Sequence, residues 1–295
     1  MKEFQRFHPV VNFIYFVFVI GFSCFFMHPL CILISFLCAV SYLVMLKGIK
    51  KVKKTLVYVL GIVLVTALIN PLFNHEGVTI ITYFKSGNPF TLESLLYGFS
   101  AGGMLSAVIL WFLCYSEVFT SDKFIYLFGK SIPKISLVFS MTLGFVPRFL
   151  SQLKKVINAQ KLIGKDLSKG NMITRIKNAL TVLSALTTWS LENSIDTADS
   201  MKSKGYGLTG RTAFSIYKFD KRDIIILMLI SFLGIAVLVG AITGKMYFNY
   251  FPIVKMSDIS LSEVICFVFY ALLCGMPLII EIREAIRWNA LISKI

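Results

Sequence analysis

Residues 173–207 read ITRIKNALTVLSALTTWSLENSIDTADSMKSKGYG, and this stretch decides how the polar part of the chain folds. Its mostly apolar positions recur at alternating spacings of three and four, which is the spacing of one face of an α-helix. Nine residues form this seam: Ile173, Ile176, Leu180, Leu183, Thr187, Leu191, Ile195, Ala198 and Met201. The seam is about eight turns long at 3.6 residues per turn. The sequence therefore predicts a long amphipathic helix that ends at Gly205-Tyr206-Gly207.

A shorter helix is predicted just before it, between Ser151 and Ile163. One of its sides is apolar or uncharged and the other is polar or basic. The first side carries Leu153, Val156, Ile157 and Gln160, and the second carries Lys154, Lys155, Asn158 and Lys161. Gly164 follows at the position where helices commonly stop in a left-handed residue. Residues 147–211 are therefore a polar, basic, helical insert between strongly apolar stretches.

The overall composition places this insert in a membrane protein. Apolar residues make up 57% of the chain, charged residues make up 15%, and the mean hydropathy is +0.78, whereas about a quarter of a typical soluble domain is charged. We therefore expect an all-α, polytopic membrane protein with about six transmembrane helices, each near the ~20 residues that span a bilayer. The apolar runs cover residues 10–28, 29–46, 56–73, 94–116, 224–243 and 261–281.

The spans and the insert divide the chain into three predicted parts. Residues 1–116 hold transmembrane helices 1–4, residues 117–222 form a cytoplasmic module with two long amphipathic helices, and residues 223–295 hold transmembrane helices 5 and 6 and a cytoplasmic tail. Two further apolar stretches, 124–128 and 135–147, are too short or too interrupted to be assigned as spans. The region around them could lie on or within the membrane surface.

Lysine and arginine determine the predicted orientation. With both termini in the cytoplasm, all but three of the 30 lysines and arginines lie on the inner side, the exceptions being Lys85, Lys245 and Lys255. The net charge of +15 requires no nucleic acid as a partner, because this topology and an anionic inner leaflet account for it. We therefore expect a multi-pass protein of the cell membrane whose insert is cytoplasmic.

The sequence offers little for catalysis or metal binding. The six cysteines form no CxxC pair, and His8, His28 and His75 lie apart at span edges, where an interfacial or turn role is favoured over a metal site. The sequence contains no GxxxxGK[ST] loop, HExxH motif or nucleophile elbow. Acidic residues lie outside the spans or at their margins, which disfavours ion-coupled transport. We expect no catalytic residue, no metal ion and no directly bound cofactor.

Two smaller features leave their roles open. The pair Gly98-x-x-x-Gly102 in the fourth span lets another helix approach closely, and that helix belongs either to this chain or to a separate membrane subunit. Lysines lie near the predicted C-terminal end of each of the two amphipathic helices. They either stabilise the helix dipole or dock to an acidic partner. These lysines are Lys161, Lys165, Lys202 and Lys204.

The residues around the same helix ends resemble a known family. Three stretches carry the resemblance, namely FVPRF at 145–149, AQK at 159–161 and ADSMKSKGYG at 198–207, with Arg211-Thr212 following. They resemble the T component, the transmembrane coupling subunit, of energy-coupling factor transporters, a family that includes the cobalt-transport membrane protein. The stretch Ala-x-x-Met-x-x-(Arg/Lys)-Gly-(Tyr/Phe)-Gly is the most specific part, and the resemblance covers most of the chain.

The resemblance implies two coupling helices, each ending in a small-Arg-small motif that contacts one of two cytoplasmic ABC ATPases. On this sequence the motifs fall on Leu162-Ile163-Gly164, preceded by Lys161, and on Ser203-Lys204-Gly205. Isoleucine replaces the arginine of the first motif, and lysine replaces the arginine of the second. The first contact is therefore mostly apolar or relies on Lys161 or Lys165. Residues implied to support the coupling helices and to face the substrate-binding subunit are Pro147, Arg148, Ala159, Gln160, Ala198, Met201, Tyr206 and Arg211.

The function implied by the resemblance is mechanical. ATP binding would draw the two ATPases together, shift the coupling helices and pass the motion to a small hydrophobic substrate-binding membrane subunit, for uptake of a vitamin or a metal ion. ATP and Mg²⁺ would be used by the ATPases, and this chain would not be an enzyme. Two other classes remain open. Proton- or sodium-driven uptake by the chain alone would indicate a secondary transporter or channel, and turnover by the isolated chain would indicate an integral membrane lipid-modifying enzyme.

Overall fold

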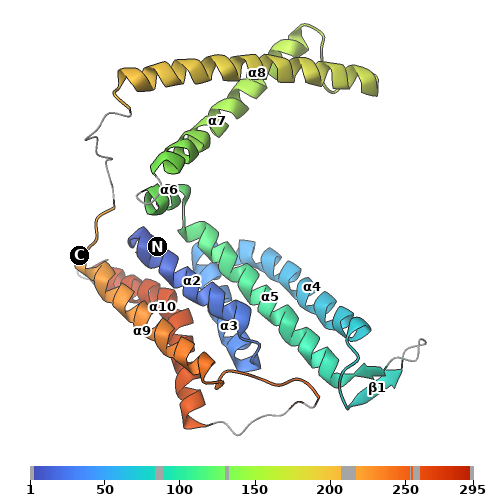
Figure 1. Ribbon diagram of the computed structural model, residues 1–295, viewed down its shortest axis with the longest axis vertical. Helices are drawn as coiled ribbons and strands as arrows, with labels where there is room; N and C mark the ends of the chain where they lie inside the picture. The colour runs from blue at the N-terminus through green and yellow to red at the C-terminus, as the bar shows by residue number, and fades with distance from the viewer. Residues whose placement is uncertain are drawn as a thin grey trace. The chain divides into compact units, whose positions relative to one another are not determined.

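The computed structural model describes residues 3–83, 89–129, 133–206, 217–252, 254 and 260–292 (Figure 1). The chain divides into two compact units. One unit, which we call the membrane unit, comprises Met1–Phe124 and Tyr217–Ile295, and the other, which we call the helical unit, comprises Ile125–Ile216. Each unit is described separately below.

Long apolar helices dominate the membrane unit, which confirms the predicted all-α, polytopic membrane class (Figure 1). Among the described residues, five helices are long and apolar enough to cross a bilayer, and α2, with 17 residues, is a shorter apolar helix. Each of these helices overlaps one of the six predicted apolar runs. Those helices are α2 (Pro9–Phe25), α3 (Pro29–Lys47), α4 (Ile49–Phe73), α5 (Leu92–Val118), α9 (Lys221–Ile242) and α10 (Leu261–Ile292), and the short helix α1 (Glu3–Arg6) precedes them.

Two of the histidines are N-caps of helices, which agrees with the turn role, one of the two roles predicted for them. His8 precedes α2 and His28 precedes α3, and in both cases Nδ1 accepts a hydrogen bond from the backbone N–H two residues later, at 3.3 and 3.2 Å respectively. Each is followed by a proline in the first turn, where the missing N–H costs nothing. The tight connection at residues 26–28 therefore results from local capping.

In the membrane unit, helix α5 contacts α2, α3 and α4. A side chain at Gly98 would meet α4, because an added Cβ would lie 2.8 Å from the Cβ of Asn70 and 3.0 Å from the carbonyl oxygen of Thr66. The glycine pair of α5 is therefore used for packing within this chain. The buried Trp111 donates from Nε1 to Ser35 Oγ at 2.9 Å, so its polar edge is satisfied inside an apolar core.

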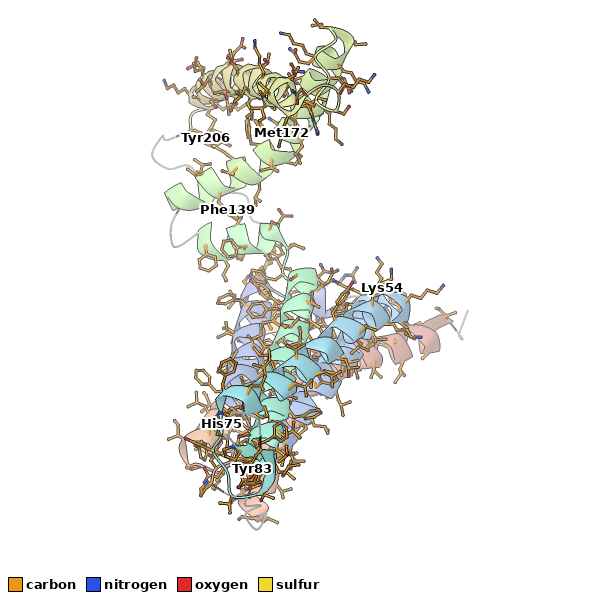
Figure 2. The ribbon with its side chains drawn as sticks, turned by 90° about the vertical axis from the view of Figure 1, so that its right-hand side faces the viewer. Lys54, His75, Tyr83, Phe139, Met172 and Tyr206 are labelled. Atoms are coloured by element: carbon orange, nitrogen blue, oxygen red, sulfur yellow. The ribbon has the colours of Figure 1, made fainter. Side chains whose placement is uncertain are left out.

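A short antiparallel hairpin connects α4 to α5, and the sequence did not predict it. Strand β1 (Ile80–Tyr83) pairs with β2 (Pro89–Thr91). The buried carboxylate of Glu93 accepts a hydrogen bond from the backbone N–H of Thr79 at 3.2 Å, which holds the hairpin against the start of α5. Lys54 and His75 mark the two ends of α4 in Figure 2, so the basic segment and the hairpin lie at opposite ends of that helix.

The N-terminal segment forms hydrogen bonds at one end of the membrane unit. At this end the chain continues into the helical unit. The N–H of Phe4 donates to Glu281 Oε1 at 3.2 Å, and Gln5 Nε2 donates to the carbonyl of Glu117 at 3.2 Å. Lys123, which is 4% exposed, donates from Nζ to the carbonyl of Gln5. Residues 117–123 are therefore held by the N-terminal segment just before residue 125, where the helical unit begins.

The segment in which the chain returns to the membrane unit also contacts the N-terminal segment. The N–H of His8 donates to Asp223 Oδ1 at 3.2 Å, and the His8 ring lies 4.2 Å from the ring of Phe219. Asp223 also accepts from the N–H of Asp220 at 3.0 Å in a capping box at the start of α9. The N-terminal segment thus anchors both connections to the helical unit, and every one of these contacts lies inside the membrane unit.

The buried lysine predicts an unusual pH dependence of stability. Burial lowers the pKa of Lys123 from 10.5 to about 8, so the folded chain holds this proton less tightly than the unfolded chain. At a pH between these two pKa values, the chain takes up a proton when it unfolds. The free energy of unfolding therefore rises with pH in that range. We expect Lys123→Met to remove this rise. Thermal unfolding of both proteins in detergent between about pH 8 and pH 10 measures it. An equal rise in the variant would contradict the assignment.

Candidate coupling site

The helical unit is built on two long helices, α7 (Pro133–Leu162) and α8 (Met172–Ser203), and α6 (Ser121–Gly129) precedes them (Figure 1). The bounds of α8 confirm the helix predicted from the apolar seam. The predicted start of the first helix at Ser151 was wrong, because α7 begins at Pro133 and includes 135–147.

Helix α7 continues through a proline because tertiary contacts flank it. Pro147 removes one backbone donor from the helix interior, which normally kinks or ends a helix. Phe145 and Phe149 flank Pro147 in the sequence, and their rings pack on Trp189 of α8. The distances between ring centroids are 5.9 and 6.5 Å respectively. Packing of the two helices therefore offsets the local cost.

The face of α8 that packs within the chain is not the predicted seam. The buried residues are Asn178, Val182 and Leu186, which are 9%, 3% and 1% exposed and recur every four residues toward Trp189. Most of the apolar seam residues lie on a neighbouring face and are exposed, with Leu183 at 55%, whereas Met201 at the end of the seam is half-buried. The buried stripe can also be found in the sequence, but the seam is longer and more regular and was therefore the pattern that the sequence analysis identified. The most apolar stripe of α8 is thus largely exposed on the described helical unit.

The connection from α7 to α8, residues 163–171, is held by side chains of α8 and by its own turns. Asn178 Nδ2 donates to the carbonyl of Asp166 at 3.1 Å, and Arg175 Nε donates to the carbonyl of Leu167 at 3.0 Å. Ser168 donates to the Asp166 carboxylate from its N–H and from Oγ, which lowers the pKa of Asp166. Asn171 Oδ1 then accepts from the N–H of Met172 at 2.8 Å and caps α8. The end of α7 is therefore fixed relative to α8.

Helix α7 ends in a Schellman motif at the first predicted coupling residues. Gly164 adopts a φ of +86°. Its N–H donates to the carbonyl of Lys161 at 3.1 Å, and the N–H of Lys165 donates to the carbonyl of Gln160 at 2.9 Å. This pattern places Ile163 at the C-cap, directly before the glycine. We call residues 162–164 the first tip.

Helix α8 ends in the same motif at the second set of coupling residues. Gly205 adopts a φ of +73°, its N–H donates to the carbonyl of Lys202 at 3.0 Å, and the N–H of Tyr206 donates to the carbonyl of Met201 at 3.1 Å. Lys204 is therefore the C-cap and corresponds in geometry to Ile163. We call residues 203–205 the second tip. Helix α8, with 32 residues, is roughly 48 Å long at 1.5 Å per residue.

The structure brings several of the predicted supporting residues together near the second tip. Arg148 of α7 lines a cavity of about 320 Å³ together with Met201, Lys204 and Tyr206. Arg148 and Met201 also line a neighbouring cavity of about 510 Å³ between the two helices, which Ala198 and Phe145 help to form. Figure 2 labels Tyr206 and Met172 near the two ends of α8.

The other predicted residues that the structure describes do not join this cluster. Pro147 lies in α7 beside Arg148 but lines neither cavity, and Ala159 and Gln160 lie in the last turns of α7 next to the first tip. Arg211 lies outside the described residues. The predicted residues therefore form two sites, one at each tip, and the assignment of ATPase contacts to them stays a prediction.

The glycines of the tips give a direct stability prediction. Alanine at Gly164 would have to adopt a left-handed φ, although nothing lies within 4 Å of an added Cβ. We expect Gly164→Ala to cost about 1 kcal/mol and to expose the capped N–H groups. Gly144→Ala is the matched control, because Gly144 lies inside α7 with equally open space and ordinary helical φ, and it should stabilise the helix by up to about 1 kcal/mol. Hydrogen exchange at residues 164 and 165 measures the difference, and unchanged exchange in Gly164→Ala would contradict it.

Comparison with known proteins supports the resemblance carried by these motifs. The family model described as "Cobalt transport protein" (CbiQ) matches residues 1–216. The chain is 37% identical over 100 residues to the energy-coupling factor transporter transmembrane protein EcfT of Lactobacillus helveticus. It is 28% identical over 160 residues to EcfT of Staphylococcus aureus and 26% identical over 197 residues to EcfT 1 of Listeria monocytogenes.

These matches cover only part of each protein. They span 34%, 52% and 62% of this chain and 36%, 60% and 69% of the Lactobacillus, Staphylococcus and Listeria proteins respectively. The family model covers well over half of the chain, including α7, α8 and both tips. The chain therefore belongs to the CbiQ family and is a membrane component of the energy-coupling factor transporter type, as the motifs at its helix ends predicted.

Proposed function

We propose that this chain is the coupling subunit of an ATP-driven importer, and that each tip binds one of two cytoplasmic ABC ATPases. The observation that carries this proposal is the equivalence of the tips. Two helices that differ in sequence end in the same Schellman motif, with Ile163 and Lys204 at the same C-cap position. Both C-cap residues are exposed, so each tip is accessible to a partner.

The exposed seam of α8 suits the second contact of a coupling subunit. Its apolar side chains, such as Ile176 and Leu191, are 55% and 64% exposed, and an apolar stripe of this length is typical of a helix that binds an apolar surface. We propose that the seam binds a small hydrophobic membrane subunit, which itself binds the transported vitamin or metal ion. This chain would then contribute no residue to substrate recognition.

Rigid packing supports transmission of force between these surfaces. Trp189 and Leu186 hold α8 on α7, and the hydrogen bonds of Asn178 and Arg175 fix the connection between them. A packed pair of helices moves as one body, whereas a flexible loop would absorb the displacement. ATP and Mg²⁺ would be bound by the ATPases, so the chain supplies geometry and no catalytic group.

The distribution of charge supports a cytoplasmic helical unit. The basic segment from Lys47 to Lys54 lies at the end of α4 opposite the hairpin, and the positive-inside rule places such short basic segments in the cytoplasm. We propose that both termini and the helical unit face the cytoplasm, where the tips would meet soluble ATPases.

Affinity purification from native membranes tests the proposal. A tag on this chain should co-purify two ABC ATPases and one small, very hydrophobic membrane protein. ATP hydrolysis should appear in the purified complex and be absent from this chain alone. Uptake driven by a proton or sodium gradient in vesicles that contain only this chain would contradict the proposal and would favour a secondary transporter.

A further inference from the structure

The two tips share a backbone geometry but differ in the chemistry of their side chains. In the first tip, Leu162 is 89% exposed and Ile163 is 72% exposed. In the second tip, Ser203 and Lys204 occupy the same two positions and are also exposed. Leu162 and Ile163 stay in contact with solvent in this chain, and their burial by a partner would be favourable.

We propose that the first tip inserts into an apolar socket with an acidic rim on its ATPase, whereas the second tip inserts into a polar socket that pairs with Lys204. This inference rests on the proposed function and adds that the two ATPase-binding positions are not interchangeable. The chain would therefore bind its ATPases in one fixed order.

The apolar floor of the first socket follows from the geometry of the cap. Ile163 takes the C-cap position that a cation takes in the second tip. The nearest cations, Lys161 and Lys165, lie two residues before and two residues after the C-cap, so neither occupies the position that Lys204 takes in the second tip. The two side chains nearest the glycine in the first tip are therefore apolar, and only an apolar socket can gain from burying them.

The acidic rim follows from the charge around the first tip. Residues 151–178 contain seven lysines and arginines and a single acidic residue, Asp166. Residues 192–204, which lead to the second tip, contain three acidic residues and two lysines. An ATPase surface complementary to the first region is acidic over a wide area, whereas a surface complementary to the second region is acidic only where it meets Lys204. The cations of the first region are Lys154, Lys155, Lys161, Lys165, Lys169, Arg175 and Lys177.

The decisive variant is Ile163→Lys, which gives the first tip the chemistry of the second. An apolar socket predicts at least a roughly tenfold loss of the ATPase bound at the first tip, because a buried lysine must be desolvated without a partner. Two acidic sockets predict the opposite sign, since the new cation would strengthen binding. Ile163→Val is the control, because it keeps the apolar contact and should change binding less than about threefold.

The measurement uses the complex purified from membranes. Each ATPase is quantified per copy of this chain, and cysteines introduced by Leu162→Cys and Ser203→Cys report by crosslinking which ATPase contacts each tip. Loss of the ATPase crosslinked at residue 162 in Ile163→Lys, with Ile163→Val unaffected, supports the inference. Tighter binding in Ile163→Lys overturns it.

Two further outcomes separate this inference from the proposed function. If no ATPase co-purifies with the unaltered chain, the proposed function fails. If ATPases are lost on Lys204→Glu but bind more tightly to Ile163→Lys, only the apolar socket fails.

An apolar tip surrounded by cations is also suited to a lipid surface. Unchanged ATPase binding in Ile163→Lys, together with a blue shift of a fluorophore at Leu162→Cys in phosphatidylglycerol liposomes, would assign the tip to lipid and overturn the inference.

Discussion

Lys204→Glu is expected to weaken binding of the ATPase at the second tip severely while leaving the chain inserted in the membrane. Lys204 is the exposed C-cap residue of α8 and lies beside the last carbonyl groups of that helix. Reversing its charge opposes the negative end of the helix dipole, which costs about 0.3–1 kcal/mol. It also places like charges together in a socket suited to a cation, and the total penalty of about 3 kcal/mol corresponds to a roughly hundredfold loss of affinity.

Two control variants isolate the C-cap position. Lys202→Glu makes the same change of charge in the last turn of the same helix, on an exposed residue that contributes only its carbonyl to the cap. We expect this variant to retain most of the bound ATPase. Lys204→Arg keeps the charge and adds a planar donor group, so its binding should equal or exceed that of the unaltered chain. Normal co-purification of both ATPases with Lys204→Glu would refute the role given to the second tip.

The elements that the sequence predicted are those whose signals are local. The seam from Ile173 to Met201 and the glycine at position 205 define α8, because helix periodicity and a left-handed stop are both properties of a short segment. Gly164 identified the end of α7 for the same reason. The start of α7 was missed, because Pro147 is a helix breaker in isolation and only Trp189, 42 residues later, shows why the helix continues.

The remaining features depend on contacts that are distant in sequence. The hydrogen bond from Lys123 to the carbonyl of Gln5 joins residues 118 positions apart, and that from Phe4 to Glu281 joins residues 277 apart, so no periodic pattern announces them. The hairpin strands β1 and β2 contain four and three residues, too few for an alternating pattern to be distinguished from a loop.

The seam of α8 shows why apolar periodicity does not identify the buried face of a subunit. The stripe buried in this chain contains a polar residue, Asn178, whereas the more apolar stripe is exposed. In a chain that works alone the most apolar stripe is normally the buried one. A subunit of a complex must also keep an apolar surface for its partners. Leu183 and Leu186 lie on these two stripes and are only three residues apart, so they give a matched test.

Leu186→Ser is expected to disrupt the helical unit, whereas Leu183→Ser is expected to remove only a partner. Leu186 is 1% exposed on the face that carries Trp189. Replacing it leaves a cavity and buries a hydroxyl, which costs about 3–5 kcal/mol. Leu183 is 55% exposed, so its replacement changes the stability of the unit by less than about 1 kcal/mol. The loss in helix propensity is the same for both variants and cancels in the comparison.

The two variants should differ in what they co-purify. Leu183→Ser should keep both ATPases, because the tips and the packing of α7 on α8 are unchanged, but should lose the hydrophobic subunit by about tenfold or more if the seam binds it. Leu186→Ser should lose every partner, because separation of α8 from α7 displaces both tips, and amides of α8 should exchange faster with solvent. Equal retention of the hydrophobic subunit in Leu183→Ser and in the unaltered chain would show that the seam around Leu183 is not its binding surface. The cavities lined by Arg148 and Met201 would then be the next surface to test.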